Sequence, residues 1–587
     1  MKRILLLALA TVAYGASVMA QWYANPVEHL QIIPDTTGVY DHVIEMAPNG
    51  NTWVAFNKPV HEDCISVGLQ LVDPEGNKLF DDLLVVSNYP SKSWTAVGQY
   101  LYVDRDGNAI VAVVDQRNNN SENPEEEFEN YTVYKVSQQG EMLWGKEGIT
   151  LQGDEVFDLA CGMNITQMTD GSYVMAWMHN RANDYNMMSI ELQRLSADGE
   201  LLWNAEEVRL HSEREAYWYP FVVDGYNNQV ILVYAKGSSQ DLYARKLDFD
   251  GSQVWSADTR IYNGGWGNIP LWTLLTVVPS GDGGVLLTWN DDRHATNIET
   301  ARMAYIKTDG ENGFYEDNGI QLSYSDLRCF SVVGAYHDGS DRFYALWREA
   351  SASQAWYRMV AQCVTKEGDA LWGETGLEIQ PIEQTTYGYP TIQCGADDEM
   401  AFFYMRNYSN NFGNVEAFIT TVNVNDTTIR RTNEFTKCDV QTEKASLKST
   451  AMHNNEFWVT MWDDDGSLGD PDKVDRVYMQ RINADLTLGY GEKEDDAVES
   501  VTASNKTFAA VATMVSGEAM FVVDVPYTTA ATLAIYDING QLVATPFDGE
   551  LNGNRRYISW NANVPAGIYM ATLTTAGEVQ TVKVIVR

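Results

Sequence analysis

The stretch SIELQRLSADGELLW, residues 189–203, contains the unit from which most of this chain is built. Its first seven residues largely alternate between polar and apolar side chains, a period of two that is typical of a β-strand. Asp198-Gly199 then supplies the positive φ angle that a tight hairpin turn requires. Trp203 heads the strand that follows, and equivalent turns lead to Trp144, Trp255 and Trp372.

A short apolar segment precedes each such unit at a nearly constant spacing. Regular self-similarity over tens of residues indicates stacked structural units. The eight segments WVAF, IVAV, VMAW, ILVY, LLTW, YALW, AFFY and VTMW end at Phe56, Val113, Trp177, Tyr234, Trp289, Trp347, Tyr404 and Trp462, at intervals of 57, 64, 57, 55, 58, 57 and 58 residues.

Each repeat contains signals for four short strands and no helical periodicity, which is the pattern of one propeller blade. We therefore predict an all-β protein in which residues 21–490 form an eight-bladed β-propeller, with a seven-bladed ring as the alternative.

The two ends of the repeat region are expected to meet. The eighth copy lacks a Trp-headed strand, because VYMQRINADL runs into an acidic stretch. Val27 follows Trp22 by five residues, just as Val208 follows Trp203. We expect residues 22–33 to complete the last blade, which leaves no open sheet edge between the first and last blades. An ordinary N-terminal arm is the alternative.

The N-terminus has the pattern of a secretory signal peptide. Lys2 and Arg3 precede an apolar run that is short for a membrane span, and Val18-Met19-Ala20 offers small residues for cleavage. We expect residues 1–20 to be removed, and no later stretch is long and apolar enough to predict membrane insertion.

Charge and cysteine content narrow the range of partners. The chain has 81 acidic and 40 basic residues, a net charge of −41. Nucleic acid is an unsuitable partner, since phosphate binding needs clustered Lys and Arg. The cysteines form no CxxC pair, so a structural zinc site is not predicted, and their spacing assigns no disulfide. They are Cys64, Cys161, Cys329, Cys363, Cys394 and Cys438.

A second β unit follows the repeats. Residues 491–500 form an acidic linker, and residues 501–587 contain about seven short strand patterns around an Asn539-Gly540 hairpin signal. We predict a small C-terminal β-sandwich for this unit.

These C-terminal residues resemble the type A sorting domain of type IX secretion substrates of Bacteroidetes. The resemblance rests on residues 536–543 (YDINGQLV), 565–569 (PAGIY) and 583–587 (KVIVR). It implies a Gram-negative host, the type IX secretion machinery as partner, and delivery to the cell surface or the medium. In that family the domain is usually cut off, and the passenger is released or joined to surface lipopolysaccharide. The matching sorting-signal positions are Asn539, Gly540, Pro565, Gly567, Lys583 and Arg587.

The repeats also resemble uncharacterised propeller-like repeats of such passengers, with a W-x-D-x-R turn whose best copy is Trp289 to Arg293. Arg117, Arg181 and Arg293 each follow their landmark residue by four positions, which suggests a recurring structural bond to Asp or to a carbonyl.

Ligand candidates come from loops that share one face of a propeller. Aromatic rings beside carboxylates suit sugars, which stack on the rings and donate hydroxyls to acceptors. Packing between blades is the alternative for each ring. The candidates are Trp94, Tyr217, Trp218, Trp266, Trp272, Asp291, Asp292 and Arg293.

Metal binding and catalysis have weaker sequence signals. Asp463, Asp464 and Asp465 form an acidic cluster that could hold calcium, although the spacing is not that of an EF-hand. No GxSxG elbow is present, and carboxylate pairs for glycoside hydrolysis cannot be selected among 81 acidic residues. We favour a glycan- or protein-binding module. The alternatives are an extracellular enzyme acting on polysaccharide or peptide, sialidase-like or another hydrolase, and a structural surface component.

Overall fold

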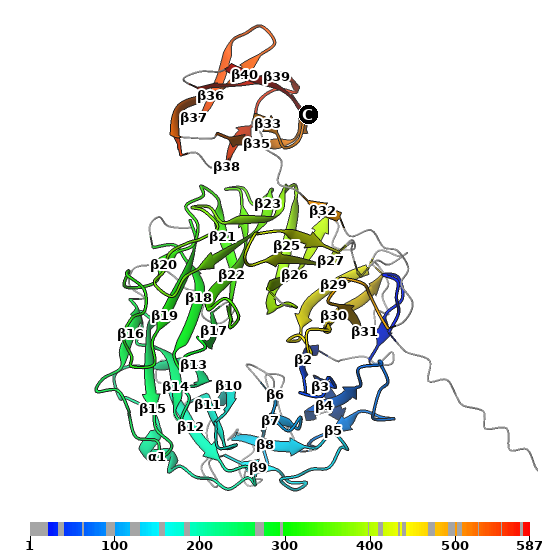
Figure 1. Ribbon diagram of the computed structural model, residues 1–587, viewed down its shortest axis with the longest axis vertical. Coiled ribbons are helices and arrows are strands. Elements are labelled where there is room, and N and C mark those ends of the chain that lie inside the picture. The colour runs from blue at the N-terminus through cyan, green and yellow to red at the C-terminus, as the bar shows by residue number, and fades with distance from the viewer. Residues whose placement is uncertain are drawn as a thin grey trace, which may run out of the picture.

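The protein is described by a computed structural model, shown in Figure 1. The structure describes residues 22–32, 40–61, 64–87, 89, 100–117, 130–151, 159–180, 188–263, 275–293, 298–396, 398–408, 415–432, 435–436, 442–467, 476–490, 499–501, 508–525, 528–552, 555–575 and 579–587.

The fold is a β-propeller: antiparallel sheets follow one another in chain order around a common centre (Figure 1). Up to Asn483 the described residues form eight such sheets. The strand nearest the centre comes first in each sheet: β2 (Tyr40–Met46), β6 (Leu101–Val103), β10 (Leu159–Gln167), β13 (Tyr217–Asp224), β17 (Thr276–Pro279), β21 (Arg328–His337), β25 (Thr385–Cys394) and β29 (Thr442–Ser449). The second strands are β3 (Thr52–His61), β7 (Ala109–Asp115), β11 (Tyr173–Asn180), β14 (Val230–Lys236), β18 (Val285–Asp291), β22 (Arg342–Ala350), β26 (Glu399–Tyr408) and β30 (Phe457–Ser467).

The eight apolar segments of the sequence all lie in these second strands, which are buried on both faces. The third strands are β4 (Cys64–Val72), β8 (Asn130–Val136), β12 (Ser189–Leu195), β15 (Asp241–Leu247), β19 (Thr300–Ile306), β23 (Tyr357–Val364), β27 (Val415–Asn423) and β31 (Arg476–Asn483). The outer strands are β5 (Leu84–Val85), β9 (Ile149–Thr150), β16 (Thr259–Tyr262), β20 (Ile320–Gln321), β24 (Leu377–Glu383), β28 (Ile429–Arg431) and β1 (Leu30–Gln31). The β10–β12 sheet carries instead the one-turn helix α1 (Ala205–Val208) and an isolated bridge between Ile190 and Leu210.

The repeated Gln has a structural role. In the third sheet the buried Gln193 amide accepts hydrogen bonds from the backbone N–H groups of Arg194 (2.8 Å) and Trp203 (3.1 Å), and it donates to the carbonyl of Trp203 (3.2 Å). The Gln362 amide likewise accepts from the backbone N–H of Trp372 at 2.9 Å, and it donates to the carbonyl of Gly373 at 2.7 Å. A buried amide satisfied on both sides fixes the start of the Trp-headed segment.

The repeated Trp joins one sheet to the next. Nε1 of Trp203 donates to the carbonyl of Phe249 at 2.9 Å, in the hairpin turn of the following sheet. The ring also lies against Gly251, whose φ of 86° and close neighbours leave no room for a Cβ. Equivalent bonds run from Trp144 to Ala197 and from Trp255 to Thr308.

The N-terminal arm belongs to the last sheet. β1 pairs antiparallel with β31, with Leu30 opposite Met479 and Gln31 opposite Tyr478. Gln480 donates to the carbonyl of Tyr23 at 3.1 Å. The arm thereby provides the outermost strand of the β29–β31 sheet.

The C-terminal part forms two further sheets around one apolar core. The first contains β33 (Phe508–Ala510), β35 (Gly517–Asp524) and β38 (Arg555–Ala562). The second contains β34 (Met514–Val515), β40 (Val579–Val586), β39 (Gly567–Thr575), β36 (Thr528–Asp537) and β37 (Leu542–Asn552). Between propeller and C-terminal sheets, β32 (Glu499–Val501) pairs with β28 and becomes a fifth strand of that propeller sheet.

Two further observations concern membrane-spanning helices and the cysteines. Among the described residues no helix has the length and apolar character needed to cross a bilayer. Cys329, Cys363 and Cys394 are free thiols.

Candidate functional site

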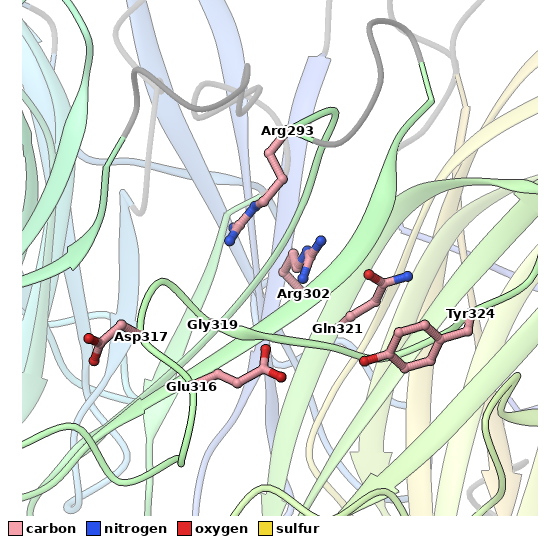
Figure 2. Close-up of a pocket in the computed structure, with 7 residues that line it drawn as sticks. All are labelled: Arg293, Arg302, Glu316, Asp317, Gly319, Gln321 and Tyr324. Atoms are coloured by element: carbon pink, nitrogen blue, oxygen red, sulfur yellow. The ribbon is translucent and has the colours of Figure 1, made fainter.

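An open pocket of about 610 Å³ lies over the outer half of the β17–β20 sheet (Figure 2). It combines two guanidinium groups, two carboxylates, an amide and a phenol. We call it the arginine pocket, and it is lined by Arg293, Arg302, Glu316, Asp317, Gly319, Gln321 and Tyr324.

Asp291 fixes the inner wall of the arginine pocket. Its side chain is fully buried at the end of β18, and it accepts a hydrogen bond from Nε1 of Trp289 at 2.8 Å. Arg293 donates to the same carboxylate from Nε (2.9 Å) and Nη2 (2.6 Å), and its guanidinium lies 4.7 Å from the ring centre of Tyr262. This charge-assisted pair holds Arg293 in a single orientation at the rim.

Arg302 provides the least satisfied group in the pocket. Its side chain is 3% exposed, and Nε donates to the hydroxyl of Thr300 at 3.1 Å. The Nη2 atom is buried and has no hydrogen-bond partner within the part of the chain that the structure describes. Burial, followed by repulsion from Arg293, lowers the pKa of Arg302 to about 10. A buried donor without an acceptor is costly, so an oxygen that reached this atom would be bound favourably.

Acceptors and an exposed ring complete the pocket. Figure 2 shows the guanidinium of Arg302 between Arg293 and Glu316, whereas the carboxylate of Asp317 points away from Arg302. The turn carrying both carboxylates can pass close to Trp289 because Gly319, at φ 79°, has no Cβ. The ring of Tyr324 is 61% exposed. The pocket thus offers donors, acceptors and an aromatic face within one opening.

The pocket lies where the repeat departs from its own pattern. Phe314 follows Gly310 by four residues, the position at which Trp203 follows Gly199. Ala304 occupies the position of the anchoring Gln193, and Arg302 that of Glu191. The strand start is therefore not fixed by the usual amide, and the loop before β20 carries polar side chains instead.

A second cleft of about 470 Å³ lies at the β13–β15 sheet. Trp218 and Tyr243 line it, together with Lys236, whose Nζ is 2.9 Å from a carboxylate oxygen of Glu215. Tyr217 lies beside this cleft, with the ammonium of Lys236 5.7 Å from its ring centre.

The sequence candidates fall into three groups. Tyr217 and Trp218 lie at the second cleft, and Arg293 lines the arginine pocket. Asp291 is buried behind that pocket, and Asp292 beside it is partly exposed. Trp94, Trp266 and Trp272 lie outside the described residues. Arg302, Glu316, Gln321 and Tyr324 were not predicted.

The expected recurrent Arg bond exists at two of its three positions. Arg117 donates to Asp115 from Nε (3.0 Å) and Nη2 (2.7 Å), as Arg293 does to Asp291. Arg181 lies outside the described residues. These Asp–Arg pairs stabilise the ends of second strands and are part of the scaffold.

The acidic cluster on β30 lies beside basic side chains of neighbouring strands. Nδ1 of His42 lies 2.5 Å from Asp463, and Nζ of Lys444 lies 4.0 Å from Asp464. The side chain of Asp465 lies outside the described set. Where the structure describes the chain, no group of three or more His, Cys, Asp or Glu side chains is arranged to hold a metal.

The expected sorting positions lie at the turns and edges of the C-terminal sheets. Asn539 and Gly540 form a tight turn capped by Asp537, which accepts from the backbone N–H of Asn539 at 2.8 Å. The Pro565 carbonyl accepts from the hydroxyl of Tyr569 at 2.7 Å. Gly567 begins β39, Lys583 is exposed on β40, and Arg587 donates its backbone N–H to Val515.

Comparison with known proteins defines the C-terminal part. Residues 518–587 match the model of the secretion system C-terminal sorting domain. The chain is thus a β-propeller protein with a C-terminal sorting domain. It is exported by the type IX secretion system to the cell surface or the extracellular space. No curated protein sequence was found to match it.

Solved structures give remote matches. One is a protein of unknown function from Dyadobacter fermentans (8% identity, 77% of this chain and 98% of that chain, TM-score 0.31). Another is an α-L-arabinanase of Penicillium chrysogenum complexed with arabinobiose (10% identity, 78% of this chain and 98% of that chain, TM-score 0.33). A third is a GH93 α-L-arabinofuranosidase of Fusarium graminearum with arabinobiose (9% identity, 68% of this chain and 98% of that chain, TM-score 0.31). Likeness at these TM-scores carries no argument about function.

Proposed function

We propose that this protein is a carbohydrate-binding protein of the cell surface or medium and that the arginine pocket is its ligand site. The observation that carries the proposal is that Arg302 lines an open pocket while its buried Nη2 atom lacks an acceptor where the structure describes the chain. A sugar hydroxyl can accept from this atom and donate to Glu316 in the same pose, because hydroxyls do both. Tyr324 provides a ring on which the apolar face of a sugar can stack.

The proposal includes a specific architecture. Residues 1–20 are a cleaved signal peptide, and residues 21–490 are an eight-bladed propeller closed by the N-terminal strand. Residues 491–500 link it to a β-sandwich sorting domain at 501–587, and the host belongs to the Bacteroidetes. The eight consecutive sheets and the β1–β31 pairing support the ring.

A glycoside hydrolase is the second candidate function. It is favoured by two neighbouring carboxylates, Glu316 and Asp317, in a pocket that also contains arginine and tyrosine. Hydrolysis needs two carboxyl groups on either side of one glycosidic bond. Incubation with each bound oligosaccharide, followed by chromatography of the products, separates cleavage from binding.

The test is an array of neutral and uronic-acid oligosaccharides, from disaccharides to octasaccharides, followed by calorimetry on the best ligands. Arg302→Met should weaken binding about tenfold or more, which corresponds to about 1.4 kcal/mol. The matched control is Arg260→Met, which removes an exposed guanidinium from β16 outside the pocket. Thermal unfolding of both variants checks the fold. Wild-type affinity in Arg302→Met, or no binding of any oligosaccharide, would refute the proposal.

A further inference from the structure

The sorting domain is seated on the propeller through an apolar contact. Leu327, Trp356 and Ile382 of the propeller are at most 6% exposed and belong to the same buried cluster as the core of the sorting domain. Figure 1 shows the C-terminal sheets beside the β21–β24 sheet, at the outer rim of the ring. The two parts therefore share a core rather than being joined by a tether alone.

Polar contacts fix the orientation of this seat. Glu378 on β24 accepts hydrogen bonds from Nη1 of Arg555 (2.9 Å) and from the hydroxyl of Tyr557. The guanidinium of Arg358 lies 4.7 Å from the ring centre of Tyr557 and also reaches Glu378 at 3.4 Å. At the far side, Glu518 accepts from the hydroxyls of Ser351 (2.9 Å) and Ser353.

The seat adjoins the arginine pocket. A smaller cavity of about 190 Å³ lies between propeller and sorting domain. Tyr324 lines both this cavity and the arginine pocket, so the two openings share one wall. The opposite wall of the smaller cavity is formed by Arg555, Arg556 and Tyr557 of the sorting domain.

We propose that the seated sorting domain is a cap that closes one end of the ligand groove. This inference rests on the proposed function of the arginine pocket. A glycan that enters beside Arg302 and extends past Tyr324 meets the sorting domain. When the sorting domain leaves its seat, the groove continues over Leu327 and Arg358. The capped protein thus binds short oligosaccharides, and the uncapped protein gains contacts with longer ones.

The experiment opens the seat in the full chain without changing the arginine pocket, which neither Ser353 nor Arg555 lines. Ser353→Glu places a carboxylate opposite Glu518, and neither Ser353 nor Glu518 lines a pocket described here. Arg555→Glu repels Glu378 from the sorting-domain side. The matched control is Lys583→Glu, which changes charge at an exposed position of β40. Hydrogen exchange of residues 351–358 reports opening of the seat. It should rise in the double variant, which combines Ser353→Glu with Arg555→Glu, but not in the control.

Binding of disaccharides to octasaccharides is then measured for each variant. We expect unchanged affinity for the shortest ligands and about tenfold tighter binding of the longest ones in Ser353→Glu and in the double variant. Equal affinities at every length, with exchange increased, would refute the cap while leaving the Arg302-dependent site intact. Unchanged exchange in the double variant would refute the seat. Absence of binding to every protein would refute the ligand site and the cap together.

Discussion

The indole Nε1 of Trp22 donates a hydrogen bond to the carbonyl oxygen of Pro74, with 3.0 Å between the two atoms. Pro74 lies in the hairpin turn of the first sheet, and Gly76 of that turn approaches the Trp22 ring. The same relation joins Trp203 of the third sheet to Phe249 in the hairpin turn of the fourth. Trp22 therefore acts as the Trp of the last sheet, although it lies at the other end of the chain.

Substitution of Trp22 should destabilise the whole ring. Trp22→Ala removes a side chain that is 3% exposed, and loss of a buried Trp costs about 3–5 kcal/mol. We expect a lower thermal midpoint in a single transition, and a similar effect from deletion of residues 21–35. The control is Tyr23→Ala, because that side chain is 40% exposed. An unchanged midpoint in Trp22→Ala would show that closure does not couple the first and last sheets.

Glu45 should make stability depend on pH. Burial raises the pKa of this carboxyl to about 8, against the lowering effect of a hydrogen bond from the Val103 backbone N–H. The folded protein therefore binds more protons than the unfolded chain between about pH 4.5 and pH 8. Its stability should fall as the pH rises through that interval, by on the order of 1 kcal/mol per pH unit, and level off above it.

Glu45→Gln removes this titration and still offers an amide oxygen to Val103. Chemical unfolding at several pH values should show the variant gaining stability over wild type as the pH rises from 5 to 9. Glu200→Gln, at an exposed position, is the control and should follow wild type. A constant difference between Glu45→Gln and wild type across the range would contradict the raised pKa.

Asp291 should be required for the fold around the arginine pocket. Its removal leaves two buried guanidinium groups without their carboxylate, and breaking a buried pair costs about 3–5 kcal/mol. Asp291→Ala should therefore unfold at much lower denaturant than wild type. Asp291→Asn should lose less, since it retains an acceptor for Trp289. Asp292→Ala provides the neighbouring comparison, and equal losses at both positions would contradict the buried role of Asp291.

Export should depend on the sorting domain. Deletion of residues 501–587 should leave the propeller in the periplasm with its signal peptide removed. A folded reporter that carries a signal peptide and residues 491–587 should reach the surface in wild-type cells. The measurement is reporter content of outer-membrane and medium fractions, in wild type and in a strain without the secretion machinery. Equal delivery in both strains would argue against the assignment.

Much of the architecture could be predicted because its sequence signals are local to each repeat. Asp-Gly turns, alternating strands and the Trp that packs on the next turn lie within each repeat, so their period is visible in one sequence. The family match at residues 518–587 confirms the predicted sorting domain. The β1–β31 pairing agrees with the expected seam, since Trp22 carries the same signal as Trp203.

The site was harder to predict because it depends on departures from the repeat. Asp291 and Arg293 were chosen for their motif, yet Asp291 is buried and serves to orient Arg293. Arg302 was missed because a strand position reveals nothing of an unsatisfied Nη2. The contact of Glu378 with Tyr557 joins residues that are 179 positions apart, and no local pattern encodes such a pair.

The pairing of Leu30 with Met479 sets an order of events during export. With the proposed signal peptide at residues 1–20, the N-terminal arm would cross the inner membrane first, and its partner strand would be among the last parts of the propeller to follow. The arm would therefore have no partner strand until β31 follows. Ring closure is then a late step, and pairing between residues far apart in the chain forms slowly. In the chain β31 is followed by β32 and then by the strands of the sorting domain. The sorting domain thus emerges only after all strands of the propeller. The outer-membrane machinery therefore meets the sorting domain together with a propeller whose ring is able to close.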